Sequence, residues 1–190
     1  MKIALSGAHG VGKTTLGRYL YQYYQAGHKV LFAEGIARGI IARGYSLGMS
    51  ATMSSYVEYI VDYLTSLAQA KEYEIYFSDR SLLDSYAYAL TNQHNGHSLI
   101  TLRELELLRL VWELEQKEFD LYLYLPIQFP IEQDGIRPSS EDYQEQISQT
   151  VLTLLQEYRL PYITIAGSQK EMQQQAMSRI NVLLEQACPL

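Results

Sequence analysis

The sequence has too few cysteines for covalent or metal cross-linking. Cys188 is the only cysteine among 190 residues, so neither an internal disulfide nor a cysteine-based metal cage can form. Apolar runs are also short, and none approaches the roughly 18 residues that a membrane-spanning helix requires. Residues 1–6 lead directly into a glycine loop and leave no room for a signal peptide. We therefore expect a cytoplasmic protein without membrane contact.

Positive charge is scarce as well. The 15 lysines and arginines are outnumbered by 21 aspartates and glutamates, which gives a formal net charge of −6. Non-specific polynucleotide binding depends on a broad positive field, so a polynucleotide partner, such as the substrate of a 5′-kinase module, is disfavoured. With 47% hydrophobic residues, the chain can bury one substantial core. We expect a single domain over residues 1–190, and assembly as a homodimer is left open.

Short apolar segments alternate with longer amphipathic ones along the chain. The short segments have strand character, and the longer ones carry apolar residues at helical spacing. Parallel neighbours need crossover connections, so this alternation predicts an α/β fold with a parallel sheet and helices on both faces. Strands are expected at residues 2–6, 29–33, 74–78, 121–125 and 162–165, and helices at residues 13–26, 51–72, 82 onward, 102–118, 143–158 and 169–187.

Three stretches interrupt this pattern. Glycines at positions 35, 39, 44 and 48 break a weakly helical stretch, which we expect to be irregular. Residues 92–98 are polar and are expected to form a loop, and residues 126–142 contain three prolines without apolar periodicity. Within the expected helix at residues 51–72, Tyr56, Tyr59 and Tyr63 share one face and are expected to pack against the sheet.

The most specific motif follows the first expected strand. The octapeptide GAHGVGKT matches the phosphate-loop (Walker A) pattern G-x-x-x-x-G-K-[ST], and it lies between an expected strand and an expected helix. Glycines let successive backbone N–H groups face phosphate oxygens, and the positive end of the following helix adds to the same anion site. We expect contacts to ATP from Gly7, Ala8, His9, Gly10, Val11, Gly12, Lys13, Thr14 and Thr15.

Two further features narrow the class of phosphate-loop protein. The Asn-Lys-x-Asp tetrapeptide that GTP-specific proteins use for base recognition does not occur in the sequence. Many motor ATPases end the magnesium strand with Asp-Glu, but Asp79 is followed by Arg80, which cannot act as a base. We expect Thr14 and Asp79 to hold Mg²⁺, Lys13 to bridge the β and γ phosphates, and Arg80 to bind the acceptor or the transferring phosphate.

The segment that begins at Asp79 resembles known families. Its sequence DRSLLDSYAY looks like the Asp-Arg segment of thymidylate kinases and the Glu-Arg-Ser segment of deoxynucleoside kinases. Together with the phosphate loop, Glu34 and Arg137, it is most similar to the small AAA-type ATPase and kinase group that includes the nicotinamide-riboside kinase domain. This resemblance implies a three-layer P-loop NTPase fold, a five-stranded sheet of order 2-3-1-4-5, and a lid at about residues 128–142.

The acceptor side is expected at the end of the second strand. Glu34 would open onto the crevice beside the phosphate loop, where it could orient or deprotonate an acceptor hydroxyl. Arg38 and Arg43 follow, and one or both could grip an acceptor phosphate or carboxylate. Arg137, in the expected lid, is a candidate for stabilising charge on the transferring phosphoryl group.

These features predict an ATP-dependent phosphotransferase that acts on a small nucleoside, nucleotide or related metabolite. The alternative is a regulatory or accessory ATPase that acts through a protein partner, with residues 35–50 or the lid as a nucleotide-dependent switch. The sequence leaves open whether the acceptor group is a hydroxyl or a phosphate.

Overall fold

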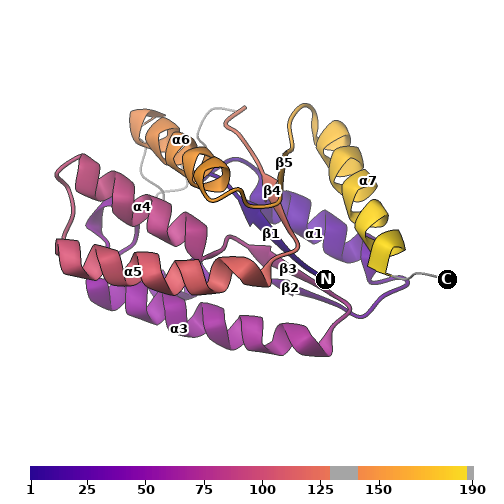
Figure 1. Ribbon diagram of the computed structural model, residues 1–190, viewed down its shortest axis with the longest axis horizontal. Coiled ribbons are helices and arrows are strands. Elements are labelled where there is room, and N and C mark those ends of the chain that lie inside the picture. The colour runs from indigo at the N-terminus through magenta and orange to yellow at the C-terminus, as the bar shows by residue number, and fades with distance from the viewer. Residues whose placement is uncertain (129–140, 188–190) are drawn as a thin grey trace.

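Five parallel strands form a sheet at the centre of the protein (Figure 1). The structure is a computed structural model and describes residues 1–128 and 141–187. The strand order β2-β3-β1-β4-β5 confirms both the expected α/β fold and the order implied by the family resemblance. The strands are β1 (Lys2–Ser6), β2 (Val30–Ala33), β3 (Ile75–Asp79), β4 (Leu121–Tyr124) and β5 (Tyr162–Thr164).

Helices cover both faces of this sheet (Figure 1). Helix α1 contacts α7 on one face, whereas α4 contacts α5 and α6 on the other. No helix within residues 1–128 and 141–187 is both long and apolar enough to cross a membrane. The helices are α1 (Lys13–Tyr24), α2 (Ile36–Ala42), α3 (Met53–Gln69), α4 (Leu82–His94), α5 (Leu102–Glu115), α6 (Glu141–Glu157) and α7 (Gln169–Ala187), with short 3₁₀ turns η1 (Gly48–Ser50), η2 (Ala70–Glu72) and η3 (Gln116–Glu118).

The register of the sheet brings the carboxyl ends of three strands together. Leu5 of β1 lies opposite Asp79 of β3, and Ala33 at the end of β2 lies opposite Ser78. Because these strands are parallel, the loops that follow them open at the same edge of the sheet. The phosphate loop, Glu34 and the turn after Asp79 therefore converge on one crevice.

The glycine-interrupted stretch is more regular than its sequence predicts. Residues 36–42, which we expected to be irregular, form α2. Gly35 and Gly44 adopt positive φ angles of 82° and 89°, so the glycines bend the chain at the two ends of the helix. Glycine therefore sets the limits of a short helix here and does not prevent it.

Helix α4 also extends beyond its expected end. Residues 92–94, expected to lie in a loop, form its last turn. The side-chain amide of Asn92 donates to the carbonyl of Gly48 at 2.9 Å, and its oxygen accepts from the Tyr143 hydroxyl at 2.8 Å. These contacts to distant segments stabilise a turn that the local polar sequence alone would not favour.

Helix α3 buries its aromatic face, as the apolar spacing predicts. Tyr56, Tyr59 and Tyr63 are each at most 5% exposed. The Tyr63 hydroxyl donates to the carboxyl group of Glu115 on α5. Glu115 is 4% exposed, and its second oxygen has no hydrogen-bond partner in the described part of the chain. Burial therefore raises the pKa of Glu115 to about 8.

This buried carboxyl group predicts a pH-dependent stability. The ordinary pKa of this carboxyl group is 4.5. Between pH 4.5 and about pH 8, the unfolded chain therefore releases the Glu115 proton while the folded protein retains it. The contribution of Glu115 to stability is therefore complete below pH 4.5 and is lost as the pH rises to about 8. Glu115→Gln should gain stability relative to the wild type by about 1.4 kcal/mol for each pH unit across that window.

Urea unfolding at a series of pH values measures this difference. The control is Glu157→Gln, because Glu157 is exposed near the end of α6. Parallel pH profiles for the wild type and Glu115→Gln would show that Glu115 ionises as readily in the folded protein as in the unfolded chain.

Candidate active site

The phosphate loop joins β1 to α1 at the edge where the strands end. Gly7 has a φ angle of 139°, and a Cβ atom there would lie 2.4 Å from the carbonyl oxygen of Leu125, so only glycine fits. Gly12, with a φ angle of 90°, caps the start of α1. Residues 9–15 line a cavity, whereas Gly7 and Ala8 form the base of the loop behind them. An anion in this cavity would meet the positive end of α1.

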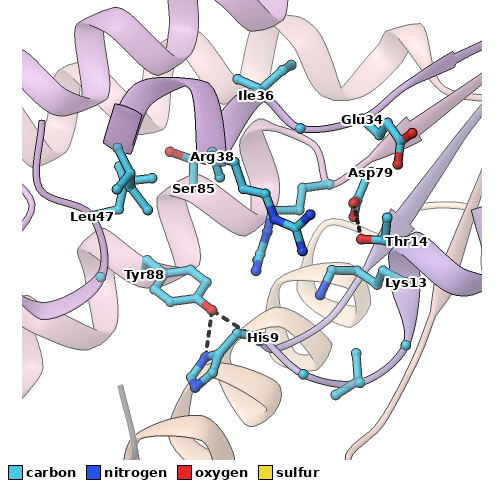
Figure 2. A pocket seen from close by; sticks show the side chains of 18 of the residues that line it. His9, Lys13, Thr14, Glu34, Ile36, Arg38, Leu47, Asp79, Ser85 and Tyr88 are labelled. Atoms are coloured by element: carbon cyan, nitrogen blue, oxygen red, sulfur yellow. Dashed lines mark hydrogen bonds between the residues drawn. The ribbon is translucent and has the colours of Figure 1, made fainter. Parts of the chain in front are cut away.

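Lys13 lies almost completely within the loop. It is 5% exposed, and its ammonium group donates to the carbonyl oxygens of Gly7 at 2.7 Å and Ala8 at 2.5 Å. The side chain also lines the cavity, where Figure 2 shows it beside Thr14. A phosphate tail placed along the loop would therefore come within reach of a fixed positive charge.

Thr14 and Asp79 meet across the crevice from two different elements. The Thr14 hydroxyl donates to a carboxylate oxygen of Asp79 at 2.5 Å (Figure 2). A hydroxyl and a carboxylate are hard oxygen donors that suit Mg²⁺, which usually takes one or two protein ligands and completes its shell with water and phosphate. The pair therefore fits the expected metal, although residues 1–128 and 141–187 contain no cluster of three or more acidic, histidine or cysteine ligands.

Arg80 is held in an unusual backbone conformation directly after β3. Its φ angle is 88°, its N–H donates to the Leu5 carbonyl at 3.0 Å, and its carbonyl accepts from the Ser78 hydroxyl at 2.6 Å. The guanidinium lies 5.3 Å from the centre of the Tyr88 ring. Burial lowers the pKa of Arg80, but Tyr88 and the nearby acidic groups outweigh it and raise the pKa overall. Arg80 therefore stays charged.

Asp84 links the phosphate loop to α4, and the sequence analysis did not identify it. Its carboxylate is fully buried and accepts from the Ser6 hydroxyl at 2.9 Å, the Gly7 N–H at 2.9 Å and the Ser81 N–H at 3.0 Å. Ser81 and Asp84 form a capping box at the start of α4. The Ser-x-x-Asp spacing was the available signal, but it predicts only a helix start and not the contact with the loop.

His9 belongs to the loop, but its imidazole does not face solvent. The side chain is 5% exposed, and its Nδ1 lies 2.9 Å from the Tyr88 hydroxyl (Figure 2). The His9 N–H donates to the same hydroxyl at 3.2 Å, and its carbonyl accepts from the Gln144 side chain at 2.6 Å. These contacts fasten the loop to α4 and α6.

The cavity continues beyond the phosphate loop and has a volume of about 1460 Å³. Its far end is built from α2, η1, α3 and α4, and aromatic and apolar side chains predominate there with a few hydroxyl groups. The phosphate-loop end is lined by residues 9–15 and by Ser168, Gln169, Met172 and Gln173, and the far end includes Tyr45, Leu47, Ala51, Tyr56, Tyr59, Ser85 and Tyr88.

Glu34 lies where the sequence predicts, at the edge of the cavity after β2 (Figure 2). One of its carboxylate oxygens accepts from Nε of Arg18 at 2.8 Å. The Glu34 side chain is 34% exposed and that of Arg18 is 56% exposed. The carboxylate therefore has one oxygen in an ion pair at the rim of the cavity.

The structure separates the two arginines expected on the acceptor side. Arg38 lines the cavity, and Figure 2 shows its guanidinium pointing toward the interior. Arg43 does not line it, because its guanidinium pairs with Asp62 of α3 at 2.7 Å and with Glu58 at 3.3 Å. Arg137 and most of the expected lid lie outside the described residues.

Residues 2–172 match the family model described as an AAA domain. The chain belongs to this AAA domain family. No curated protein matches the chain significantly.

Solved structures share the fold of this AAA domain protein. Deoxyadenosine kinase from M. mycoides with bound dATP has a TM-score of 0.69 at 17% identity, over 95% of this chain and 99% of that one. NadR in complex with NR has a TM-score of 0.68 at 18% identity, over 88% of this chain but only 46% of NadR. The family match and the shared fold confirm the resemblance to the P-loop nucleoside and nucleotide kinase-like group.

Proposed function

We propose that this protein is an ATP-dependent phosphotransferase that moves the γ-phosphate of Mg-ATP to a small nucleoside, nucleotide or related metabolite. The observation that supports this most directly is the continuous cavity, which joins the phosphate loop to the far end formed by α2, α3 and α4. Its volume of about 1460 Å³ exceeds the roughly 300–1,000 Å³ typical of a pocket for one small ligand. The cavity thus has room for a donor and an acceptor side by side.

In the proposed mechanism, most of the rate enhancement comes from positioning and charge stabilisation. Lys13 would stabilise charge on the β and γ phosphates, and Arg80 would stabilise the transferring phosphoryl group. Mg²⁺, held by Thr14 and Asp79 directly or through water, would supply further neutralisation of the phosphates. Glu34 would align the acceptor through a hydrogen bond to its second carboxylate oxygen.

The ligands named for the similar structures support this class of reaction. Deoxyadenosine kinase from M. mycoides is described with dATP and with the products dCMP and dCDP. NadR is described with NR and with NAD and AMP-PNP. Nucleosides and nucleotides are therefore the first acceptors to test with this protein.

A coupled assay for ADP formation tests the proposal. The acceptor panel should contain nucleosides, nucleoside monophosphates and nicotinamide riboside, with Mg-ATP as donor. We expect ADP formation to depend on at least one acceptor, and mass spectrometry should find the acceptor heavier by one phosphate. ADP release that no acceptor changes would contradict the proposal.

Asp79→Ala tests the metal site separately. Removing the carboxylate should lower kcat/KM by about 10–100-fold at fixed Mg²⁺ and raise the Mg²⁺ concentration needed for half-maximal activity. Asp62→Ala is the control, because Asp62 pairs with Arg43 away from the cavity. An unchanged Mg²⁺ dependence in Asp79→Ala would show that the metal is held elsewhere.

The alternative function is a regulatory or accessory ATPase. Helix α2 and η1 line the same cavity as the phosphate loop, so a change there on nucleotide binding could reach a protein partner. Such a protein would hydrolyse ATP slowly without any acceptor and would bind its partner only in one nucleotide state.

A further inference from the structure

The cavity carries positive charge in addition to that of Lys13. The acidic side chains that line the described cavity are Glu34 and Asp79, and both already have partners. Arg18 pairs with Glu34, whereas Arg38 and Arg80 line the same cavity without an ion pair among the described residues. Neither guanidinium group forms an ion pair with a described residue, although the charges of Asp84 and Asp79 act on Arg80.

Arg80 shows this lack of a partner most clearly. Its Nη1 is buried and has no hydrogen-bond partner within residues 1–128 and 141–187. A buried N–H of a charged group costs free energy unless it is paired. The Tyr88 ring offers a cation–π contact but no hydrogen-bond acceptor at its face. An anionic oxygen of a ligand would supply the missing acceptor.

Arg38 lies on the acceptor wall and not on the donor wall. It comes from α2, which lines the cavity together with the aromatic far end. Figure 2 shows its guanidinium pointing inward, between Tyr88 and Lys13. The phosphate tail of the donor has its own cations on the opposite wall, namely Lys13 and the metal expected at Thr14 and Asp79. Arg38 is therefore available to the acceptor.

The state of Glu34 points in the same direction. A hydroxyl acceptor loses a proton during transfer and benefits from a nearby free carboxylate. One oxygen of the Glu34 carboxylate instead accepts from Nε of Arg18 at 2.8 Å, so this carboxylate is not free of a protein partner. A phosphate oxygen is already ionised near neutral pH and needs no such base.

From the position of Arg38 and the unpaired nitrogen of Arg80, we propose that the acceptor group is a phosphate, and that the acceptor is a nucleoside monophosphate. An acceptor phosphate oxygen attacks the γ-phosphorus of ATP, the bond from that phosphorus to the β,γ-bridging oxygen breaks, and ADP leaves with the bridging oxygen. The products are ADP and a nucleoside diphosphate. The base lies among the aromatic rings of the far end, where it can pack on Tyr56, Tyr59 or Tyr88. This inference rests on the proposed function.

A kinetic comparison of matched acceptors tests the inference. Each nucleoside is compared with its own 5′-monophosphate in the ADP assay, so that the two acceptors share base and sugar. We expect the preferred monophosphate to have a kcat/KM at least about 10-fold above that of its nucleoside. Arg38→Gln should raise KM for the monophosphate about 10–100-fold, the value of hydrogen bonds to a charged group, and should change KM for the nucleoside little.

Arg103→Gln is the matched control, because Arg103 is exposed on α5 and does not line the cavity. Transfer to nucleosides that equals or exceeds transfer to monophosphates would overturn the inference and leave the proposed function intact. An equal loss of both activities in Arg38→Gln would also overturn it. Absence of acceptor-dependent ADP with both acceptor types would overturn the proposed function and this inference with it.

Discussion

Lys13→Ala is expected to lower acceptor-dependent ADP formation by about 10²–10³-fold, the typical loss when one fixed donor to a developing charge is removed. Lys13 is 5% exposed and already lies against the loop, with its ammonium group 2.7 Å from the Gly7 carbonyl oxygen. The positive charge is therefore in place before the nucleotide arrives, and little reorganisation is needed during transfer. Steady-state kinetics with the best acceptor measures the loss.

Folding and nucleotide binding must be measured alongside this loss. Circular dichroism and thermal unfolding should show that Lys13→Ala remains folded, and calorimetry should report its affinity for Mg-ATP. Lys71→Ala is the control, because Lys71 is exposed in η2 and does not line the cavity. Full activity in folded Lys13→Ala would mean that the loop does not hold the transferred phosphate.

Asp84→Ala is expected to lower the free energy of unfolding by about 3–5 kcal/mol. The substitution leaves three buried donors without their shared acceptor, namely the Ser6 hydroxyl and the N–H groups of Gly7 and Ser81. It also removes a negative charge that acts on the buried Arg80 guanidinium. Chemical denaturation measures the change, with Glu157→Ala as an exposed control that should stay within about 0.5 kcal/mol.

Asp84→Asn separates the effect of shape from that of charge. The amide has nearly the same size, but one of its two oxygen acceptors becomes an NH₂ group that faces existing donors. An intermediate loss of roughly 1–3 kcal/mol is expected. Because Gly7 begins the phosphate loop, both variants should also weaken Mg-ATP binding. Wild-type stability in Asp84→Ala would show that the three donors find other acceptors.

The sequence was most informative where chemistry depends on the backbone. The phosphate-loop pattern requires glycines at fixed positions, and the structure shows that a side chain at Gly7 would collide with the Leu125 carbonyl. The position of Asp79 was equally predictable, because Asp79 follows a short apolar run. The position of Thr14, its hydrogen-bond partner, is fixed by the motif. Local sequence therefore defined the phosphate loop and the two residues that meet beside it, Thr14 and Asp79.

The sequence did not distinguish the two arginines that were expected on the acceptor side. Arg38 and Arg43 lie in the same short stretch and looked equivalent in sequence. Arg38 lies in the first turn of α2, whereas Arg43 is the C-cap residue that follows the last residue of the helix, Ala42. The structure places Arg38 in the cavity, while Arg43 pairs with Asp62 on α3.

The sequence by itself determined the class of fold, the phosphate loop and the order of charged residues at the strand ends. These features follow from glycine geometry, from apolar periodicity and from residues that lie close together in the sequence. The tertiary structure alone decided the network around Asp84, the burial of His9 and Glu115, and the separation of Arg38 from Arg43. Each of these depends on which side chain from a distant segment supplies a partner, and spacing along one chain does not contain that information.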